Sequence, residues 1–114
     1  MHSYTAVVQK GIKRGTALGF PTVNIPLNDE KISGIYVGRV QIDTMIYHSA
    51  VFANQERKIL EAYILDFSGD LYDKEITIEL HKKIREAGKF TNDETLKKQI
   101  ADDISEVRKY FHSF

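Results

Sequence analysis

The sequence predicts a mainly β fold: a small, closed, antiparallel barrel with one C-terminal α-helix packed on it. Hydrophobic residues alternate with period two over most of the chain, and turn signals interrupt this alternation at short intervals. Near Thr91 the period becomes helical. With 114 residues the chain has room for one core, so we expect a single domain over residues 1–114, with the barrel at about 3–90 and the helix at about 92–111.

Six segments are candidates for strands: Tyr4–Val8, Thr22–Asn24, Gly34–Ile42, Met45–Phe52, Leu60–Phe67 and Glu75–Leu80. The turn signals between them, such as Ser33-Gly34 and Asp43-Thr44, lie too close together for helical crossovers, which favours antiparallel neighbours. Closing five or six such strands into a barrel leaves no exposed sheet edge.

The C-terminal helix is predicted from a single apolar stripe formed by Leu96, Ile100, Ile104, Val107 and Phe111. Its start is marked by a capping box, with Thr91 as the N-cap and Glu94 three residues later. We expect the stripe to cover one side of the barrel.

Composition excludes several classes of function. Lys and Arg number 16, Asp and Glu also number 16, and the pI is about 6.9, so no overall field attracts nucleic acid or an anionic membrane. The chain has no cysteine, which excludes disulfides, a thiolate zinc site and a cysteine nucleophile. No segment approaches the roughly 18 apolar residues of a membrane span. We therefore expect a cytoplasmic protein without nucleic-acid or membrane partners. The four histidines lack the spacing of metal ligands: His2, His48, His81 and His112.

A glycine-rich stretch is the first candidate binding element. Gly11, Gly15 and Gly19 recur every four residues, and glycine permits the close backbone approach that lets successive N–H groups surround an anion. Lys13 and Arg14 add positive charge to it. The stretch is neither a Walker A motif nor a Rossmann fingerprint, since it lacks the Gly-Lys-Ser/Thr ending and leads into a proline instead of a helix. It predicts a phosphate-binding loop, and the alternative is a surface turn with a solvated Lys-Arg pair.

The residues after this stretch suggest a metal site. Pro21 fixes its own φ and favours an extended chain, so Thr22 and Asn24 face one side of a strand and Val23 faces the other. A hydroxyl and an amide oxygen are hard donors suited to Mg²⁺, which completes its shell with phosphates and water.

Several motifs occur in one order over almost the whole chain: KRGTALGFPTVNI, GIYVGRV, EAYILDFSGDLYDKEITIEL and KKIREAGKFTNDETLKKQIADDI. In this the chain resembles the riboflavin kinase (flavokinase) family, and in particular the C-terminal kinase domain of bacterial bifunctional FAD synthetases. The resemblance implies a six-stranded Greek-key barrel. It also implies an ATP:riboflavin 5′-phosphotransferase, which uses Mg²⁺ with ATP to convert riboflavin into FMN and leaves ADP. We expect a monomeric, stand-alone kinase domain and assign it no adenylyltransferase activity.

The resemblance also assigns residues. Gly15, Gly19, Pro21, Thr22 and Asn24 match the nucleotide loop of the family, with Thr22 and Asn24 as the ligands of Mg²⁺ and phosphate. Gly11, Lys13 and Arg14 join this nucleotide-binding set by their position. Glu61 matches the catalytic base and begins a predicted strand, where the alternative is a solvated strand-end glutamate.

Three further residues match a segment that lies near the flavin and the phosphates in the family: Arg85, Lys89 and Phe90. As substrate-binding residues, Arg85 would pair with phosphate and Phe90 would pack against the isoalloxazine ring. For Phe90 a second interpretation stays open. It would be a hydrophobic staple if Thr91 is the N-cap.

The chain departs from the family pattern between Ser49 and Leu60. The usual Asn-Ile-Gly-x-x-Pro-Thr motif is absent, and Asn54 to Lys58 forms a short polar turn where the family has a longer loop. In the family this region helps to build the nucleotide and flavin pockets. The alternative function is therefore a kinase-like barrel that binds flavin or nucleotide without turnover, as a regulatory or interaction module. A third candidate, an oligonucleotide-binding barrel, is disfavoured by the neutral charge.

Overall fold

The computed structural model describes residues 2–9, 22–67, 69, 71 and 73–112. The predicted phosphate loop, with Gly11, Lys13, Arg14, Gly15, Gly19 and Pro21, lies outside the described residues. Thr22 and Asn24, which follow it, lie inside them.

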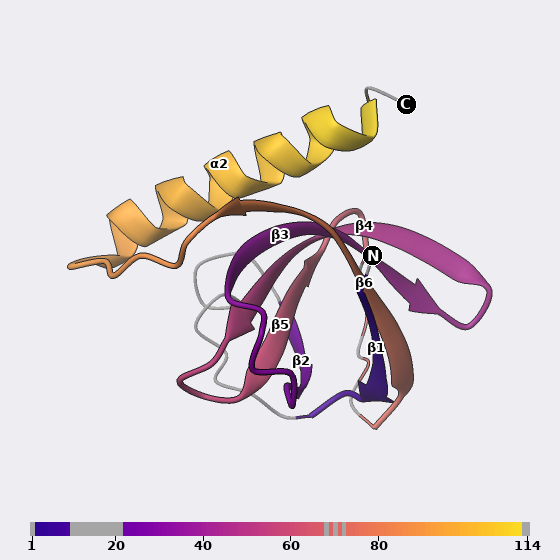
Figure 1. Cartoon of the computed structure of the whole chain (residues 1–114). Helices are drawn as coiled ribbons and strands as arrows, with labels where there is room; N and C mark the ends of the chain where they lie inside the picture. Colours follow the sequence, from indigo (N-terminus) through magenta and orange to yellow (C-terminus); the bar gives the residue numbers. More distant parts are fainter. Residues whose placement is uncertain (1, 10–21, 68, 70, 72, 113–114) are drawn as a thin grey trace.

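Six strands and one helix make up the described fold (Figure 1). The elements are β1 (His2–Val7), β2 (Thr22–Pro26), β3 (Gly34–Ile42), β4 (Met45–Asn54), β5 (Ile59–Ile64), β6 (Glu75–Arg85) and α2 (Asp93–His112). All strand pairs are antiparallel, and the order in the sheet is β1-β6-β3-β4-β5-β2. Because β3, β4 and β5 are consecutive neighbours and β6 returns beside β3, these four strands form a Greek key.

The sheet curls into an open half-barrel, whereas the sequence predicted a closed one. Its two edge strands, β1 and β2, meet within the described residues only at an isolated bridge between Gln9 and Asn24. There the Gln9 N–H donates to the Asn24 carbonyl at 2.7 Å. The edge strands have six and five residues, against ten in β4 and eleven in β6, so little of their length is available to close the sheet.

The concave face of the sheet holds the main core, which includes Ile25, Val40, Val51, Leu60 and Ile78. Strand β5 shows how alternation divides the two faces. Leu60, Ala62 and Ile64 belong to this core, and the residues between them point to the outer face.

Helix α2 covers the outer face over β3 and β4 (Figure 1). A second cluster joins it to the sheet, with Val107 fully buried against Val37, Ala50 and Leu65. The predicted role of the apolar stripe is therefore confirmed. No helix in the part of the chain that the structure describes is long and apolar enough to cross a membrane.

The start of the helix differs from the prediction by one residue. Asn92 is the cap in place of Thr91, because its Oδ1 accepts hydrogen bonds from the Thr95 N–H at 2.8 Å and from the Thr95 hydroxyl at 2.9 Å. Asparagine fills this position well since its short side chain reaches the N–H of the third helical residue. Phe90 then lies one residue before the staple position.

We expect Gly38→Ala to destabilise the fold by about 2–4 kcal/mol. A Cβ at Gly38 would collide with the Glu79 carbonyl and lie 2.9 Å from Val51 Cγ2, in the middle of β3. Urea unfolding followed by circular dichroism measures the loss. Gly88→Ala is the matched control, because its Cβ would come no closer than 3.5 Å to Phe90. Equal stability of the two variants would contradict this packing argument.

Candidate functional site

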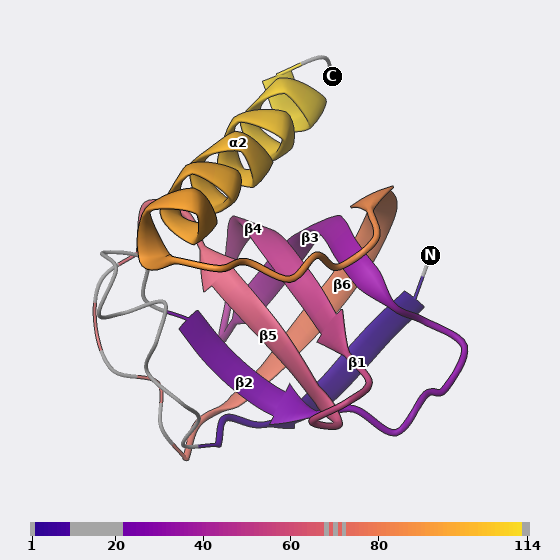
Figure 2. The same cartoon turned by 90° about the vertical axis from the view of Figure 1, so that its left-hand side faces the viewer.

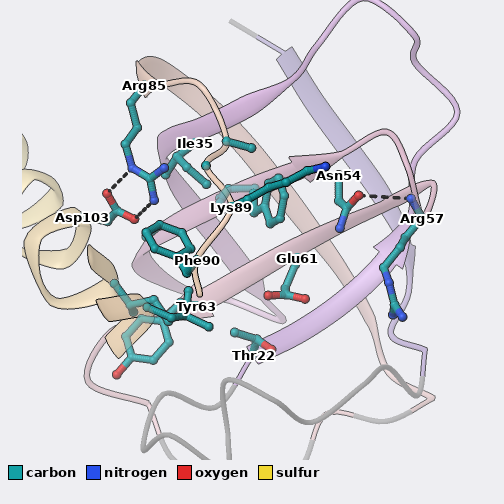
Figure 3. A pocket seen from close by; sticks show the side chains of 17 residues that line it. Thr22, Ile35, Asn54, Arg57, Glu61, Tyr63, Arg85, Lys89, Phe90 and Asp103 are labelled. Carbon is teal, nitrogen blue, oxygen red and sulfur yellow. Dashed lines mark hydrogen bonds and ion pairs between the residues drawn. The ribbon is translucent and has the colours of Figure 1, made fainter. Parts of the chain in front are cut away.

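A pocket of about 510 Å³ lies between the outer face of the sheet, the first turns of α2 and the segment that joins β6 to α2 (Figure 3). Figure 2 shows this segment crossing the sheet at the foot of the helix. The pocket is lined by Thr22, Ile35, Ala50, Val51, Phe52, Asn54, Arg57, Glu61, Tyr63, Arg85, Ala87, Gly88, Lys89, Phe90, Leu96, Ile100 and Asp103.

The register between β2 and β5 assembles the floor of this pocket. Asn24 lies directly opposite Glu61, and Thr22 lies opposite Tyr63. Since side chains alternate along both strands and Leu60 and Ala62 occupy the core, these four residues share the outer face. On the other side of β5, Phe52 lies opposite Glu61.

Glu61 is a half-buried carboxyl in the middle of this floor. Burial raises its pKa, and the positive charge of Arg57 partly opposes the rise. None of the described residues donates a hydrogen bond to its carboxylate. A partly desolvated carboxyl without a partner is a poor structural element and a suitable general base, because its affinity for a proton is increased.

The amide oxygen of Asn24 is another polar atom without a hydrogen-bond partner among the described residues. Its side chain is only 3% exposed, and its Oδ1 accepts no hydrogen bond from the described residues. Thr22, two residues earlier, lines the pocket. An orphaned buried amide oxygen beside a hydroxyl fits a hard cation such as Mg²⁺. Among the described residues no group of three or more His, Asp or Glu side chains surrounds a metal position.

Arg85 lines the pocket, and its guanidinium is hydrogen-bonded to Asp103 of helix α2. Its Nε donates to Asp103 Oδ1 at 2.9 Å and its Nη2 donates to Asp103 Oδ2 at 2.7 Å. Gln99 donates to the same Oδ1 at 3.2 Å. This two-pronged pair joins the end of β6 to α2 and forms one wall of the pocket (Figure 3). The sequence prediction had Arg85 pairing with phosphate, and in the described structure its guanidinium is held by Asp103.

The aromatic side chains form an apolar end of the pocket. Phe90 and Tyr63 both line the pocket on the side of the helix (Figure 3), and Leu96 and Ile100 add aliphatic surface from α2. Burial raises the pKa of the Tyr63 hydroxyl. Lys89 lines the same pocket and is exposed. Aromatic and aliphatic side chains of this kind can pack against a planar aromatic ligand.

The structure thus brings together five residues that the sequence singled out: Thr22, Glu61, Arg85, Lys89 and Phe90. Asn24 lies next to them by its register with Glu61. Sequence reasoning missed Tyr63, Arg57, Asn54 and the helical residues Leu96, Ile100 and Asp103. The period of β5 contained the signal for Tyr63, which is two residues after Glu61. Nothing local to the helix indicated that Asp103 would be buried against Arg85.

A curled antiparallel sheet with a pocket between its outer face and a C-terminal helix defines a small β domain. The family model described as "Flavokinase: Riboflavin kinase" matches residues 1–111. The chain therefore belongs to the riboflavin kinase family, as the sequence motifs predicted.

Individual relatives agree. The chain is 37% identical over 116 residues to the RNA-binding riboflavin kinase RibR of Bacillus subtilis (strain 168), covering 91% of this chain and 49% of that protein. It is 34% identical over 110 residues to the bifunctional riboflavin kinase/FMN adenylyltransferase of Pseudomonas fluorescens, covering 89% and 35%. The chain thus spans less than half of the length of these relatives.

Among solved structures, the fold is similar to the crystal structure of a protein described as a macrolide-efflux protein from Streptococcus pneumoniae. The TM-score is 0.80 at 26% sequence identity, and the match covers 93% of this chain and 38% of that one.

We expect Asp103→Ala to destabilise the protein by about 1–3 kcal/mol, because it leaves the Arg85 guanidinium without its partner. The loss falls below that of a fully buried pair, since the Arg85 side chain is 25% exposed. Denaturant unfolding measures it. Asp102→Ala, an exposed neighbour on the same helix, is the control and should change little. If the double variant Arg85→Met/Asp103→Leu is no more stable than Asp103→Ala, the loss does not come from the unpaired charge.

Proposed function

We propose that this chain is an ATP:riboflavin 5′-phosphotransferase, which transfers the γ-phosphoryl group of ATP to the ribityl 5′-hydroxyl of riboflavin. One observation carries the proposal: in a member of the riboflavin kinase family, Glu61 is a half-buried carboxyl that accepts no hydrogen bond from the described residues. It lines a pocket with an aromatic end and lies opposite Asn24 in the strand register. The relatives named as riboflavin kinases support the same activity.

Each part of the pocket has a role in this reaction. Glu61 accepts the proton of the 5′-hydroxyl as that oxygen bonds to the γ-phosphorus, and the bond from this phosphorus to the β–γ bridging oxygen breaks to release ADP. Thr22 and Asn24 would hold Mg²⁺, which supplies charge neutralisation to the phosphates when bound. Tyr63 and Phe90 hold the isoalloxazine ring, and the ring's position directs the ribityl chain toward Glu61.

The remaining assignments extend this proposal. We propose that the predicted phosphate loop closes over the ATP phosphates with its backbone N–H groups and its positive charges. The residues assigned to it are Gly11, Lys13, Arg14, Gly15, Gly19 and Pro21. Lys89 supplies a further positive charge beside the pocket. Arg85 has a structural role, since its hydrogen bonds to Asp103 hold α2 against the end of β6 and so fix one wall of the pocket. We also propose a monomer that acts in the cytoplasm on small-molecule substrates, without nucleic-acid or membrane partners.

The alternative function is flavin or nucleotide binding without turnover. The missing Asn-Ile-Gly-x-x-Pro-Thr segment favours it. Against it, the short segment that replaces this motif still supplies Ala50, Phe52, Asn54 and Arg57 to the pocket. The pocket is therefore lined on this side by residues of the shorter segment, even though the family motif is absent.

Incubation with riboflavin and Mg·ATP, with FMN resolved by chromatography, tests the proposal. We expect the wild-type protein to form FMN, and we expect Glu61→Gln and Thr22→Ala to lower kcat by about 100-fold or more, because they remove the base and a metal ligand. Glu75→Gln, an exposed glutamate of β6, is the matched control and should retain activity. Wild-type protein that quenches riboflavin fluorescence but forms no FMN would establish the binding module instead.

The raised pKa of Glu61 also predicts a change in stability. The folded protein holds this proton more tightly than the unfolded chain, so the free energy of unfolding falls as pH rises from the ordinary glutamate value through the raised pKa. At pH 7 the ionised carboxylate therefore costs stability, and Glu61→Gln should melt at a higher temperature than wild type. The difference should disappear near pH 4, as calorimetry at both pH values will measure. A lower melting temperature for Glu61→Gln at pH 7 would contradict this.

A further inference from the structure

Among the described residues, three cations line the pocket, and they differ in what they can offer a ligand. The Arg85 guanidinium already donates two hydrogen bonds to the Asp103 carboxylate, from Nε and Nη2. Its Nη1 donates to the Glu86 carbonyl at 3.0 Å. Lys89 belongs to the segment that follows β6. Arg57 belongs to the turn between β4 and β5, on the sheet side of the pocket (Figure 3).

The side chain of Arg57 is exposed and has no partner among the described residues. Within the described part of the chain its guanidinium makes neither a hydrogen bond nor an ion pair. Its backbone, in contrast, is well fixed, because the Arg57 N–H donates to Asn54 Oδ1 at 3.1 Å. An arginine on a fixed backbone with a free guanidinium is suited to bind an anion with two parallel hydrogen bonds.

The turn that carries Arg57 is braced from two directions. Gln55 Nε2 donates to the carbonyls of Asp29 at 2.7 Å and Ile32 at 2.6 Å, which ties the turn to the loop before β3. Lys58 takes a left-handed conformation with φ 57°, and its Nζ donates to Gln55 Oε1 at 3.2 Å. The short turn is therefore a defined structure and not merely a deletion.

The strand register places Arg57 relative to the reacting groups. Asn24 lies opposite Glu61, and Pro26 lies opposite Ile59, so the turn comes just beyond the end of the β2–β5 ladder. Arg57 thus lies past Glu61 on the side away from Tyr63 and Phe90 (Figure 3). A ligand that spans the pocket from its aromatic end would meet Glu61 first and Arg57 next.

We propose that Arg57 binds the anionic phosphate chain of the nucleotide, as a substrate-binding residue that the short β4–β5 turn supplies. This inference rests on the proposed function, since that function puts a nucleotide in the pocket. The aromatic end takes the uncharged flavin, which leaves the phosphates for the polar end. Arg57, whose guanidinium has no partner among the described residues, offers a positive charge at this end from the sheet side of the pocket.

Isothermal titration of the whole chain with Mg·ADP tests the proposal without requiring turnover. We expect Arg57→Ala to raise the Kd for Mg·ADP by about 10-fold or more, because a charge-assisted hydrogen bond is lost. Arg57→Lys should recover part of the affinity, since it keeps the charge but not the fork. Lys98→Gln, which removes an exposed cation of α2 that does not line the pocket, is the control and should leave the Kd within about 2-fold of wild type.

Two further ligands separate the possible explanations. Riboflavin affinity, followed by fluorescence quenching, should stay within about 2-fold of wild type in Arg57→Ala, and adenosine affinity should also be unchanged. Equal weakening of adenosine and Mg·ADP would mean that Arg57 contacts the nucleoside, and weakening of riboflavin alone would mean that it serves the flavin; either overturns the proposal. An unchanged Kd for Mg·ADP, or wild-type protein that binds no Mg·ADP, overturns it as well. Wild-type protein that binds Mg·ADP through Arg57 but forms no FMN would reject the transferase and keep this assignment.

Discussion

The strand register of β5 is the constraint on which the rest of the molecule depends. Its apolar residues at positions 60, 62 and 64 fill the concave core, and this forces Glu61 and Tyr63 onto the outer face. A slip of one residue would bury the carboxyl in the core and expose three aliphatic side chains. Hydrophobic burial thus fixes the position of a polar residue that contributes nothing to the core itself, and β2 and β4 then place Asn24 and Phe52 beside it.

Helix α2 and the outer face of the sheet form the pocket together. An outer sheet face on its own is a shallow surface, and only the docking of α2 through Val107 and the segment after β6 makes it a pocket. The Arg85–Asp103 pair lies where these parts meet, and two hydrogen bonds fix its geometry. Replacing such a pair with apolar residues often costs little stability. Its contribution here is therefore better understood as orientation: it sets how far the helix and the segment carrying Phe90 stand from Glu61.

Much of this arrangement follows from the sequence, for reasons that particular residues make plain. Alternation along β5 predicted its two faces, and the stripe ending at Phe111 predicted the docked helix, because both patterns are local and repeat many times. Closure of the barrel was overestimated, because it depends on how far two short edge strands overlap, which no local pattern records.

The cap moved from Thr91 to Asn92 because neighbouring residues of similar capping ability compete. The partner of Arg85 is 18 residues away on another element, and charged residues on a helix face give no sign of which one will be buried. The family motifs predicted Glu61, but Arg57 lies in the segment where the motifs fail.

Three polar groups in and beside the pocket have no hydrogen-bond partner among the described residues, and their grouping bears on function. Asn24 Oδ1 is buried without a donor from the described residues, Glu61 is half-buried without one, and the exposed Arg57 guanidinium has no acceptor among them. Outside the pocket, the buried Ser49 hydroxyl is hydrogen-bonded, whereas Arg39 Nε is buried without an acceptor among the described residues and its guanidinium lies over the Phe111 ring. Leaving an amide oxygen and a carboxylate desolvated lowers the stability of the folded protein. Selection for stability alone would remove these groups.

A ligand that brings a metal ion, a hydroxyl and an anion would satisfy all three groups together. Mg·ATP with riboflavin has this combination, which is why the unsatisfied groups, taken as a set, favour phosphoryl transfer over simple flavin binding.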